Sequence, residues 1–121
     1  MNEKQFYLGE NDDRVLLAFN FNVMREIQGV YGSISSWADK LQPKKDGEPD
    51  MGAFIKGFTF MLNEGVDIEN ETLKDNEQKQ PFTEKQVGRL IGKFGKDEIS
   101  TAMQKAIVGS TDSGDKSSKN E

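Results

Sequence analysis

Residues 50–65, DMGAFIKGFTFMLNEG, decide the fold because they are the most apolar stretch of the chain. Large apolar side chains recur in them at steps of three and four residues, which puts these side chains on one face of a helix. They are Met51, Phe54, Ile55, Phe58, Met61 and Leu62. We expect Asp50 to cap the start of this helix and Gly65 to end it in a left-handed turn. The other elements should then pack round it as a central helix.

The composition is that of one polar globular domain. The chain has 121 residues, and with 34% hydrophobic and 31% charged residues it can bury only a modest core. Its net charge of −5 makes binding to nucleic acid or to an acidic membrane surface unfavourable. No apolar run is long enough to span a bilayer, so we expect no membrane partner.

The sequence lacks the residue types on which most catalytic and metal sites depend. It contains no cysteine and no histidine, which removes the common nucleophile–base pairs and structural zinc sites. Its acidic residues lie in expected loops, without an apolar pocket that would shift their pKa values. We therefore expect a protein that is not an enzyme and takes no cofactor and no metal. The acidic stretch 1–13 has no signal-like apolar run, which indicates a cytoplasmic protein.

The N-terminal part predicts a β-hairpin. Residues 5–8 and 14–19 are short segments rich in aromatic and branched side chains, and turn-forming residues separate them at 9–13. In the alternative interpretation, residues 15–18 form the first turn of a helix.

Two short helices should follow the hairpin. Asn20 or Asn22 caps the first, Gly32 ends it, and Ser33 caps the second. We expect Trp37 to be a partly buried packing residue, and the polar stretch 42–49 to be a loop. The two apolar stripes are Val23, Ile27, Val30 and Tyr31, and then Ile34, Trp37, Ala38 and Leu41.

After the central helix the chain turns acidic. Residues 64–77 hold six carboxylates and a single lysine, Lys74. Such a run predicts a solvated, mobile connection, with an acidic partner-binding loop as the alternative.

Two signals mark the start of the next helix. Thr83 and Gln86 form a capping box, in which each side chain pairs with the backbone amide of the other residue. Phe82 and Val87 occupy the positions of a hydrophobic staple. Gly95 should end this helix.

A final amphipathic helix is expected from a cap at Asp97 to an end at Gly109. Its apolar side holds Ile99, Ala102, Met103, Ala106 and Ile107. Residues 110–121 are without apolar side chains and predict a disordered polar tail. The whole pattern predicts a single α+β, mainly α domain over residues 1–109, with an N-terminal β-hairpin followed by four or five short helices.

The last two helices raise the alternative of a small helix-turn-helix regulator that binds DNA. The segment 82–109 is locally basic, and Ser100, Thr101 and Gln104 could contact bases. Against this, the expected reading helix opens with Asp97 and Glu98, which repel phosphate. An unrelated helical adaptor is a further alternative.

Three stretches resemble the tail assembly chaperones of long-tailed bacteriophages and prophages. They are VLLAFNFNVMREIQGVYG at 15–32, DMGAFIKGFTFMLNEG at 50–65 and FTEKQVGRLIGKFGKDEISTAMQKAI at 82–107. Their order is similar to that of the family: a strand passing into an asparagine-capped helix, a central helix, a threonine- or serine-opened helix and a final amphipathic helix.

The resemblance implies a non-enzymatic protein of the bacterial cytoplasm that is not part of the mature virion. Members of the family are thought to coat the tape measure protein and deliver it to tail tube subunits. A chaperone of this kind needs an apolar surface that its partner later covers. We predict Phe60 and the two residues flanking Asn20, Phe19 and Phe21, as candidates for partner binding or self-association.

Overall fold

The computed structural model describes residues 5–11, 14–42, 47 and 49–119, and for 111–119 it describes the backbone alone. Its elements are β1 (Phe6–Leu8), β2 (Val15–Leu17), α1 (Phe21–Tyr31), α2 (Ile34–Lys40), α3 (Met51–Asn70), the 3-10 turn η2 (Asp75–Glu77), α4 (Glu84–Phe94) and α5 (Lys96–Lys119). The predicted α+β, mainly helical class with an N-terminal hairpin is therefore confirmed.

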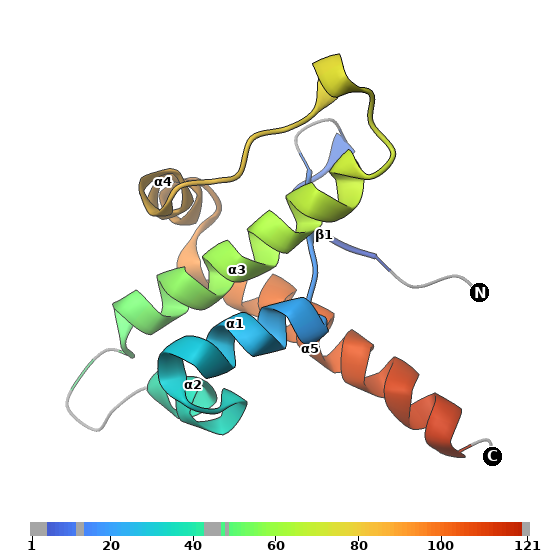
Figure 1. The fold of residues 1–121 in the computed structure, drawn as a ribbon. Coiled ribbons are helices and arrows are strands. Elements are labelled where there is room, and N and C mark those ends of the chain that lie inside the picture. The colour runs from blue at the N-terminus through green and yellow to red at the C-terminus, as the bar shows by residue number, and fades with distance from the viewer. Residues whose placement is uncertain (1–4, 12–13, 43–46, 48, 120–121) are drawn as a thin grey trace.

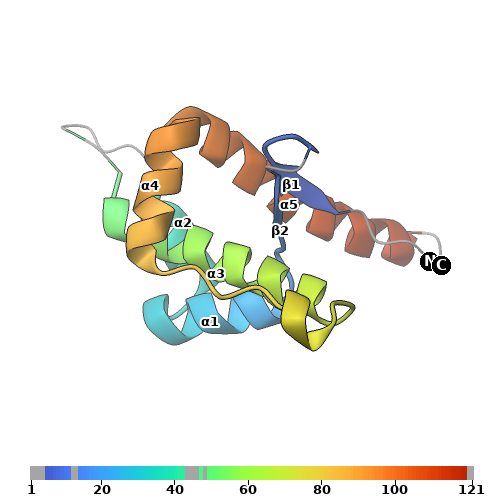
Figure 2. The same ribbon diagram turned by 90° about the horizontal axis from the view of Figure 1, so that it is seen from above.

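Helix α3 runs through the middle of the molecule, as expected for the most apolar segment (Figure 1). Helices α1 and α2 pack on one side of it, and strand β2 and helix α4 pack elsewhere on its surface. Helix α5 contacts β1, β2 and α4, so the hairpin lies between α3 and α5 (Figure 2). Within the described ranges, no helix has the length and apolar character needed to cross a bilayer.

The hairpin is held to the central helix as well as to itself. Its strands pair antiparallel, with Phe6 opposite Leu17 and Leu8 opposite Val15. Just beyond β2, the Ala18 N–H donates to the Met61 carbonyl of α3 at 3.2 Å. The alternative of a helical turn at 15–18 is therefore wrong. The turn residues Asp12 and Asp13 lie outside the described residues.

Four predicted helix caps are confirmed. In each, a side-chain oxygen accepts from the backbone N–H three residues ahead, which satisfies one of the free donors of the first turn. The pairs are Asn20 with Val23 at 3.2 Å, Ser33 with Ser36 at 3.0 Å, Asp50 with Ala53 at 3.0 Å and Thr83 with Gln86 at 3.1 Å. The Gln86 side chain also accepts from the Thr83 N–H at 2.9 Å, which completes the capping box.

The predicted apolar stripes are buried except at their ends. Phe54, Phe58, Met61 and Leu62 lie in the core, and Ile55 is half-buried. Met51 in the first turn of α3 and Val30 near the end of α1 are exposed, so their predicted burial is wrong.

Trp37 is buried more deeply than expected. The prediction of partial burial is wrong, because only 2% of its surface is exposed. Its indole N–H donates to the Ala53 carbonyl at 3.0 Å, which satisfies the polar group of a buried tryptophan. Residues 43–46 and 48 of the predicted loop that follows α2 lie outside the described residues.

Two glycines expected to end helices lie inside them. Helix α3 passes through Gly65 to Asn70, and helix α5 passes through Gly109 to Lys119. A Cβ at Gly65 would lie 2.2 Å from the Leu16 carbonyl oxygen, and one at Gly109 would lie 2.2 Å from the Phe6 ring. Both predictions are wrong for the same reason: the missing side chain permits close packing on the hairpin instead of a left-handed turn.

The two ends of α5 differ from the prediction. The Gly95 carbonyl accepts from the Ile99 N–H at 3.1 Å, so the helix starts at Lys96 and Asp97 is not its cap. The predicted disordered tail begins inside α5, since the backbone of 110–119 is helical. Asn120 and Glu121 lie outside the described residues, and the boundary of the domain at residue 109 stays a prediction.

The acidic connection is shorter than predicted. Residues 64–70 are still helical, which corrects the expected loop there, and η2 forms 75–77. The Gln78 side-chain amide donates to the carbonyls of Asn70 and Leu73, each at 2.8 Å. It thus pairs with one acceptor at the carboxyl end of α3 and with one in the turn that follows the helix.

A glycine-to-alanine pair tests the close approach of α3 to β2. We expect Gly65→Ala to destabilise the protein by about 2 kcal/mol or more, because the new Cβ forces the β2 backbone to shift. Gly88→Ala is the matched control, since nothing lies within 4 Å of a Cβ there. Alanine is the better helix former, so this control should stabilise by up to about 1 kcal/mol. Urea unfolding followed by circular dichroism measures both, and equal stabilisation would contradict the close contact.

The capping box of α4 predicts a loss of stability on Thr83→Ala. Removal of the hydroxyl leaves the Gln86 N–H without its acceptor and should lower the free energy of unfolding by about 1 kcal/mol. Thr101→Ala, at an exposed position inside α5, should change it by less than about 0.5 kcal/mol. If the urea midpoint of Thr83→Ala matched that of the unchanged protein, α4 would not depend on this cap.

Candidate partner-binding site

The described residues include no group of three or more histidine, cysteine, aspartate or glutamate side chains that could hold a metal ion. Hollows and exposed apolar side chains on the surface are the remaining candidates for a functional site. Two hollows adjoin the start of α1, where two of the three predicted partner-binding residues are found.

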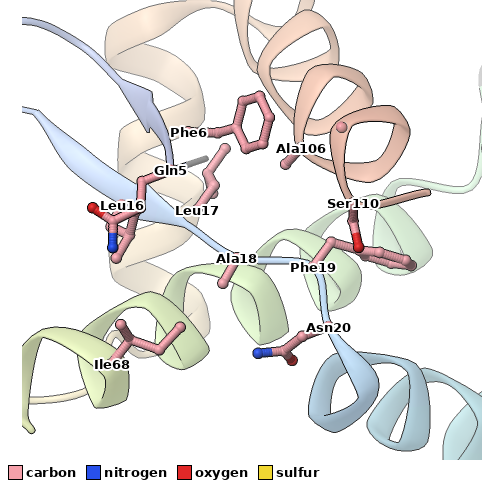
Figure 3. A pocket seen from close by; sticks show the side chains of 11 residues that line it. Gln5, Phe6, Leu16, Leu17, Ala18, Phe19, Asn20, Ile68, Ala106 and Ser110 are labelled. Carbon is pink, nitrogen blue, oxygen red and sulfur yellow. The ribbon is translucent and has the colours of Figure 1, made fainter. Parts of the chain in front are cut away.

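The first, which we name the hairpin hollow, lies between the hairpin, α5 and the end of α3 (Figure 3). Its volume is about 200 Å³. Small-molecule pockets are usually larger, about 300–1,000 Å³, so this one suits a side chain better than a cofactor. Figure 3 shows Phe6, Leu17 and Ala106 gathered at one end and Asn20 and Ile68 at the other. The remaining lining residues are Gln5, Leu16, Ala18, Phe19, Gly109 and Ser110.

A carboxylate fixes the chain beside this hollow. One oxygen of Glu64 on α3 accepts from the Asn20 side-chain amide at 2.8 Å and from the Asn22 side-chain amide at 3.0 Å. Asn20 also caps α1, so its oxygen and its nitrogen are both used. Hydrogen bonds to a charged group are the stronger kind, and these two anchor the first turn of α1 to the central helix.

The second hollow, which we name the α1–α3 hollow, lies on the other side of this anchor. It has a volume of about 330 Å³ and is mainly acidic, with Glu26, Glu64 and Asp67 around one arginine, Arg25. The other residues that line it are Asn22, Val23, Phe60 and Asn63.

The three predicted partner-binding residues differ in exposure. Phe19 belongs to the core, with 8% of its surface exposed, and Phe60 is half-buried in the wall of the α1–α3 hollow. Phe21 is 85% exposed in the first turn of α1. It stands between Asn20 and Asn22, which line one hollow each. Phe21 is therefore the one of the three whose ring can meet a partner without rearrangement.

The part that Glu64 plays was missed from the sequence, where this residue counted only as the first of an acidic run. Its partners Asn20 and Asn22 were predicted only as alternative caps of α1, of which Asn20 is the cap. Only tertiary packing brings residue 64 beside residue 20, and no local sequence pattern predicts that contact.

Helices α4 and α5, which raised the helix-turn-helix alternative, contact each other and are joined at Gly95. Asp97 and Glu98 are exposed in the first turn of α5, where they would repel a phosphate backbone. Ser100 and Gln104 line a hollow of about 650 Å³ that Trp37 and Leu41 border from the α2 side. Two of the three candidate base-contacting residues thus have α2 beside them.

Comparison with family models, with curated proteins and with solved structures gives no match. The three stretches quoted above therefore carry the family resemblance by themselves.

Truncation of Phe19 and of Phe21 compares a core phenylalanine with an exposed one. Phe19→Ala should destabilise the protein by about 3 kcal/mol or more, because it leaves a cavity in the core. Phe21→Ala should change the free energy of unfolding by less than about 0.5 kcal/mol, because the ring loses little contact. Guanidinium unfolding of both variants makes the comparison. A large loss for Phe21→Ala would mean that this ring is packed rather than exposed.

Proposed function

We propose that the protein is a tail assembly chaperone of a long-tailed phage or prophage. In this role it is a non-enzymatic protein of the bacterial cytoplasm that binds the tape measure protein and tail tube subunits and does not remain in the mature virion. The supporting observation is the order of the elements. The three stretches that carry the resemblance correspond to β2 and α1, to α3, and to α4 and α5.

The proposed contact with the tape measure protein is apolar and centres on Phe21. An aromatic ring exposed to 85% loses unfavourable contact with water when a partner covers it. Glu64 holds the first turn of α1 through Asn20 and Asn22, so the ring is presented from a fixed backbone. Binding then loses little backbone entropy.

Charge does not provide the attraction in this proposal. The chain carries a net charge of −5, and the α1–α3 hollow beside Phe21 holds three carboxylates. An acidic partner would be repelled there, so apolar contact has to outweigh the repulsion. A long helical chain with an exposed apolar stripe offers such contacts repeatedly, and many copies of this protein could cover it.

Co-expression tests the proposal. The long reading frame expected downstream in the phage genome should yield a product that aggregates alone and stays soluble in a complex with many copies of this chain. Size-exclusion chromatography with light scattering measures the mass and stoichiometry of the complex. We expect Phe21→Asp to weaken the affinity of each copy at least about tenfold, which corresponds to the loss of one aromatic anchor of about 1.4 kcal/mol or more.

The matched control is Val30→Asp, which places the same charge at a second exposed apolar position of α1. It should leave the complex largely intact, and both variants should unfold at the urea concentration of the unchanged protein. If the long product is equally soluble alone, or elutes without this chain, the chaperone proposal is wrong. If both variants weaken the complex equally, the chaperone proposal survives but the contact does not centre on Phe21.

A further inference from the structure

The chain that connects α3 to α4 runs back along α3 (Figures 1 and 2). One row of α3 side chains holds it there. We name residues 79–84 the return segment. The row consists of Lys56, Asn63 and Asn70, which are seven residues apart on α3. Seven residues are close to two helical turns, so these side chains lie along one face of the helix.

Each asparagine of the row forms a pair of hydrogen bonds with the main chain of one residue, and we name such a pair a grip. The Asn63 amide oxygen accepts from the Phe82 N–H at 2.7 Å, and its nitrogen donates to the Phe82 carbonyl at 3.1 Å. Asn70 does the same for Lys79, at 2.8 Å and 3.0 Å. A carboxamide carries one donor and one acceptor side by side, as a peptide group does, so each grip imitates the pairing of neighbouring strands.

The spacing of the two grips selects an extended ligand. Asn63 and Asn70 are separated by about 10.5 Å along the helix axis. Lys79 and Phe82 are three residues apart, which is about 10 Å in an extended chain but only about 4.5 Å in a helix. A helical segment is excluded a second time, because its own backbone uses the N–H and C=O groups that the asparagines need.

Charges at both ends of the return segment add side-chain preference. The Lys79 ammonium lies 2.8 Å from a carboxylate oxygen of Glu69. At the other end, the Lys56 ammonium lies 2.8 Å from Glu84, whose hydrogen bond and charge raise the pKa of Lys56. These contacts set the order of the side chains: Lys79 first, then Phe82, and then Glu84, which is already the first residue of α4.

The return segment itself is suited to this site. Pro81 keeps its neighbour Gln80 extended and has no N–H, but the grips use only the amides of residues 79 and 82. The Phe82 ring is half-buried against the core, whereas residues 79, 80 and 81 are exposed. The segment is therefore attached mainly through polar contacts, each of which contributes only about 0.5–1.5 kcal/mol in water.

The floor beneath the segment is apolar and incompletely filled. A cavity of about 90 Å³ lies there, with Val15, Leu16, Leu62 and Val66 among its walls. Lys79, Gln80 and Phe82 form the cover on the other side. Removal of the cover would leave a strip of α3 and β2 with apolar side chains flanked by two free carboxamides.

We propose that the row Lys56–Asn63–Asn70 is a binding site for extended peptides, which the return segment occupies as an internal ligand. The external ligand is a segment of a partner protein with the pattern Lys-x-x-Phe-x-Glu, extended from the lysine to the phenylalanine. Its backbone binds the two asparagines, its lysine binds Glu69, its phenylalanine covers the apolar floor and its acid binds Lys56. This site does not include Phe21 and does not depend on the proposed chaperone function.

A labelled peptide of residues 77–84, EQKQPFTE, tests the site in the full-length chain. The internal ligand competes at an effective concentration of the order of millimolar, so the unchanged chain should bind the peptide weakly. Lys79→Glu opposes Glu69 and weakens the internal ligand at an exposed side chain. We expect this variant to bind the peptide about threefold more tightly or better, as measured by fluorescence anisotropy. The peptide EQFQPKTE, with lysine and phenylalanine exchanged, should not bind.

The location is tested by the side-chain amide signals of Asn63 and Asn70 in ¹⁵N NMR spectra, which should shift on addition of the peptide. Asn70→Leu in the Lys79→Glu chain should abolish binding, whereas Asn76→Leu in the exposed turn η2 should not. No binding of EQKQPFTE to Lys79→Glu at several millimolar would overturn the proposal and make the return segment a purely structural connection. Binding that survives Asn70→Leu, or binding of the exchanged peptide, would also overturn it.

Hydrogen exchange gives an independent measurement on the unchanged chain. The amides of Lys79 and Phe82 should exchange at least about tenfold faster than the core amides of α3, because the site must open without global unfolding. Exchange of all these amides at the rate of global unfolding would show that the site is never vacant, and the proposal would fail.

Discussion

The structure depends on the close approach of α3 to the hairpin at Gly65. No Cβ fits there, since it would lie 2.2 Å from the Leu16 carbonyl oxygen. The same lack of a side chain lets α5 approach Phe6 at Gly109, and lets Trp37 lie against α3 at Gly57. A two-stranded hairpin is marginally stable by itself, and here it is held because a helix lies against it on either side. Residues 15–20 are thereby placed where Asn20 can reach Glu64.

Carboxamide side chains form the hydrogen bonds between segments that backbone pairing forms in a larger sheet. Asn20 ties α1 to α3, and Asn63 and Asn70 tie the return segment to α3. Asn63 and Asn70 pair with main-chain groups of Phe82 and Lys79, which lie outside regular secondary structure, and Asn20 pairs with the Val23 N–H in the first turn of α1. A small domain with a 34% hydrophobic sequence forms few large apolar contacts. These polar contacts therefore hold its connecting segments in place.

Local signals in the sequence predicted local structure well. The caps at Asn20, Ser33, Asp50 and Thr83 each span four consecutive residues, and all four are present. Glycine was misread at 65 and 109, because the same residue serves a left-handed turn and a close contact, and only the partner element decides between them. The contacts that build the candidate sites join residues 44 and 19 positions apart, and no periodic pattern encodes them.

The two proposed surfaces should bind partner segments of different backbone conformation. Phe21 offers a side-chain contact and makes no demand on the backbone of its partner, so a helix with an apolar stripe suits it. The row on α3 needs free N–H and C=O groups at a fixed spacing, which only an extended chain has. The two surfaces are anchored by consecutive residues of one rigid helix, Glu64 and Asn63, and both residues also line the α1–α3 hollow. A partner with a helical stripe and an extended segment could therefore occupy both at once, because neither contact needs α3 to move.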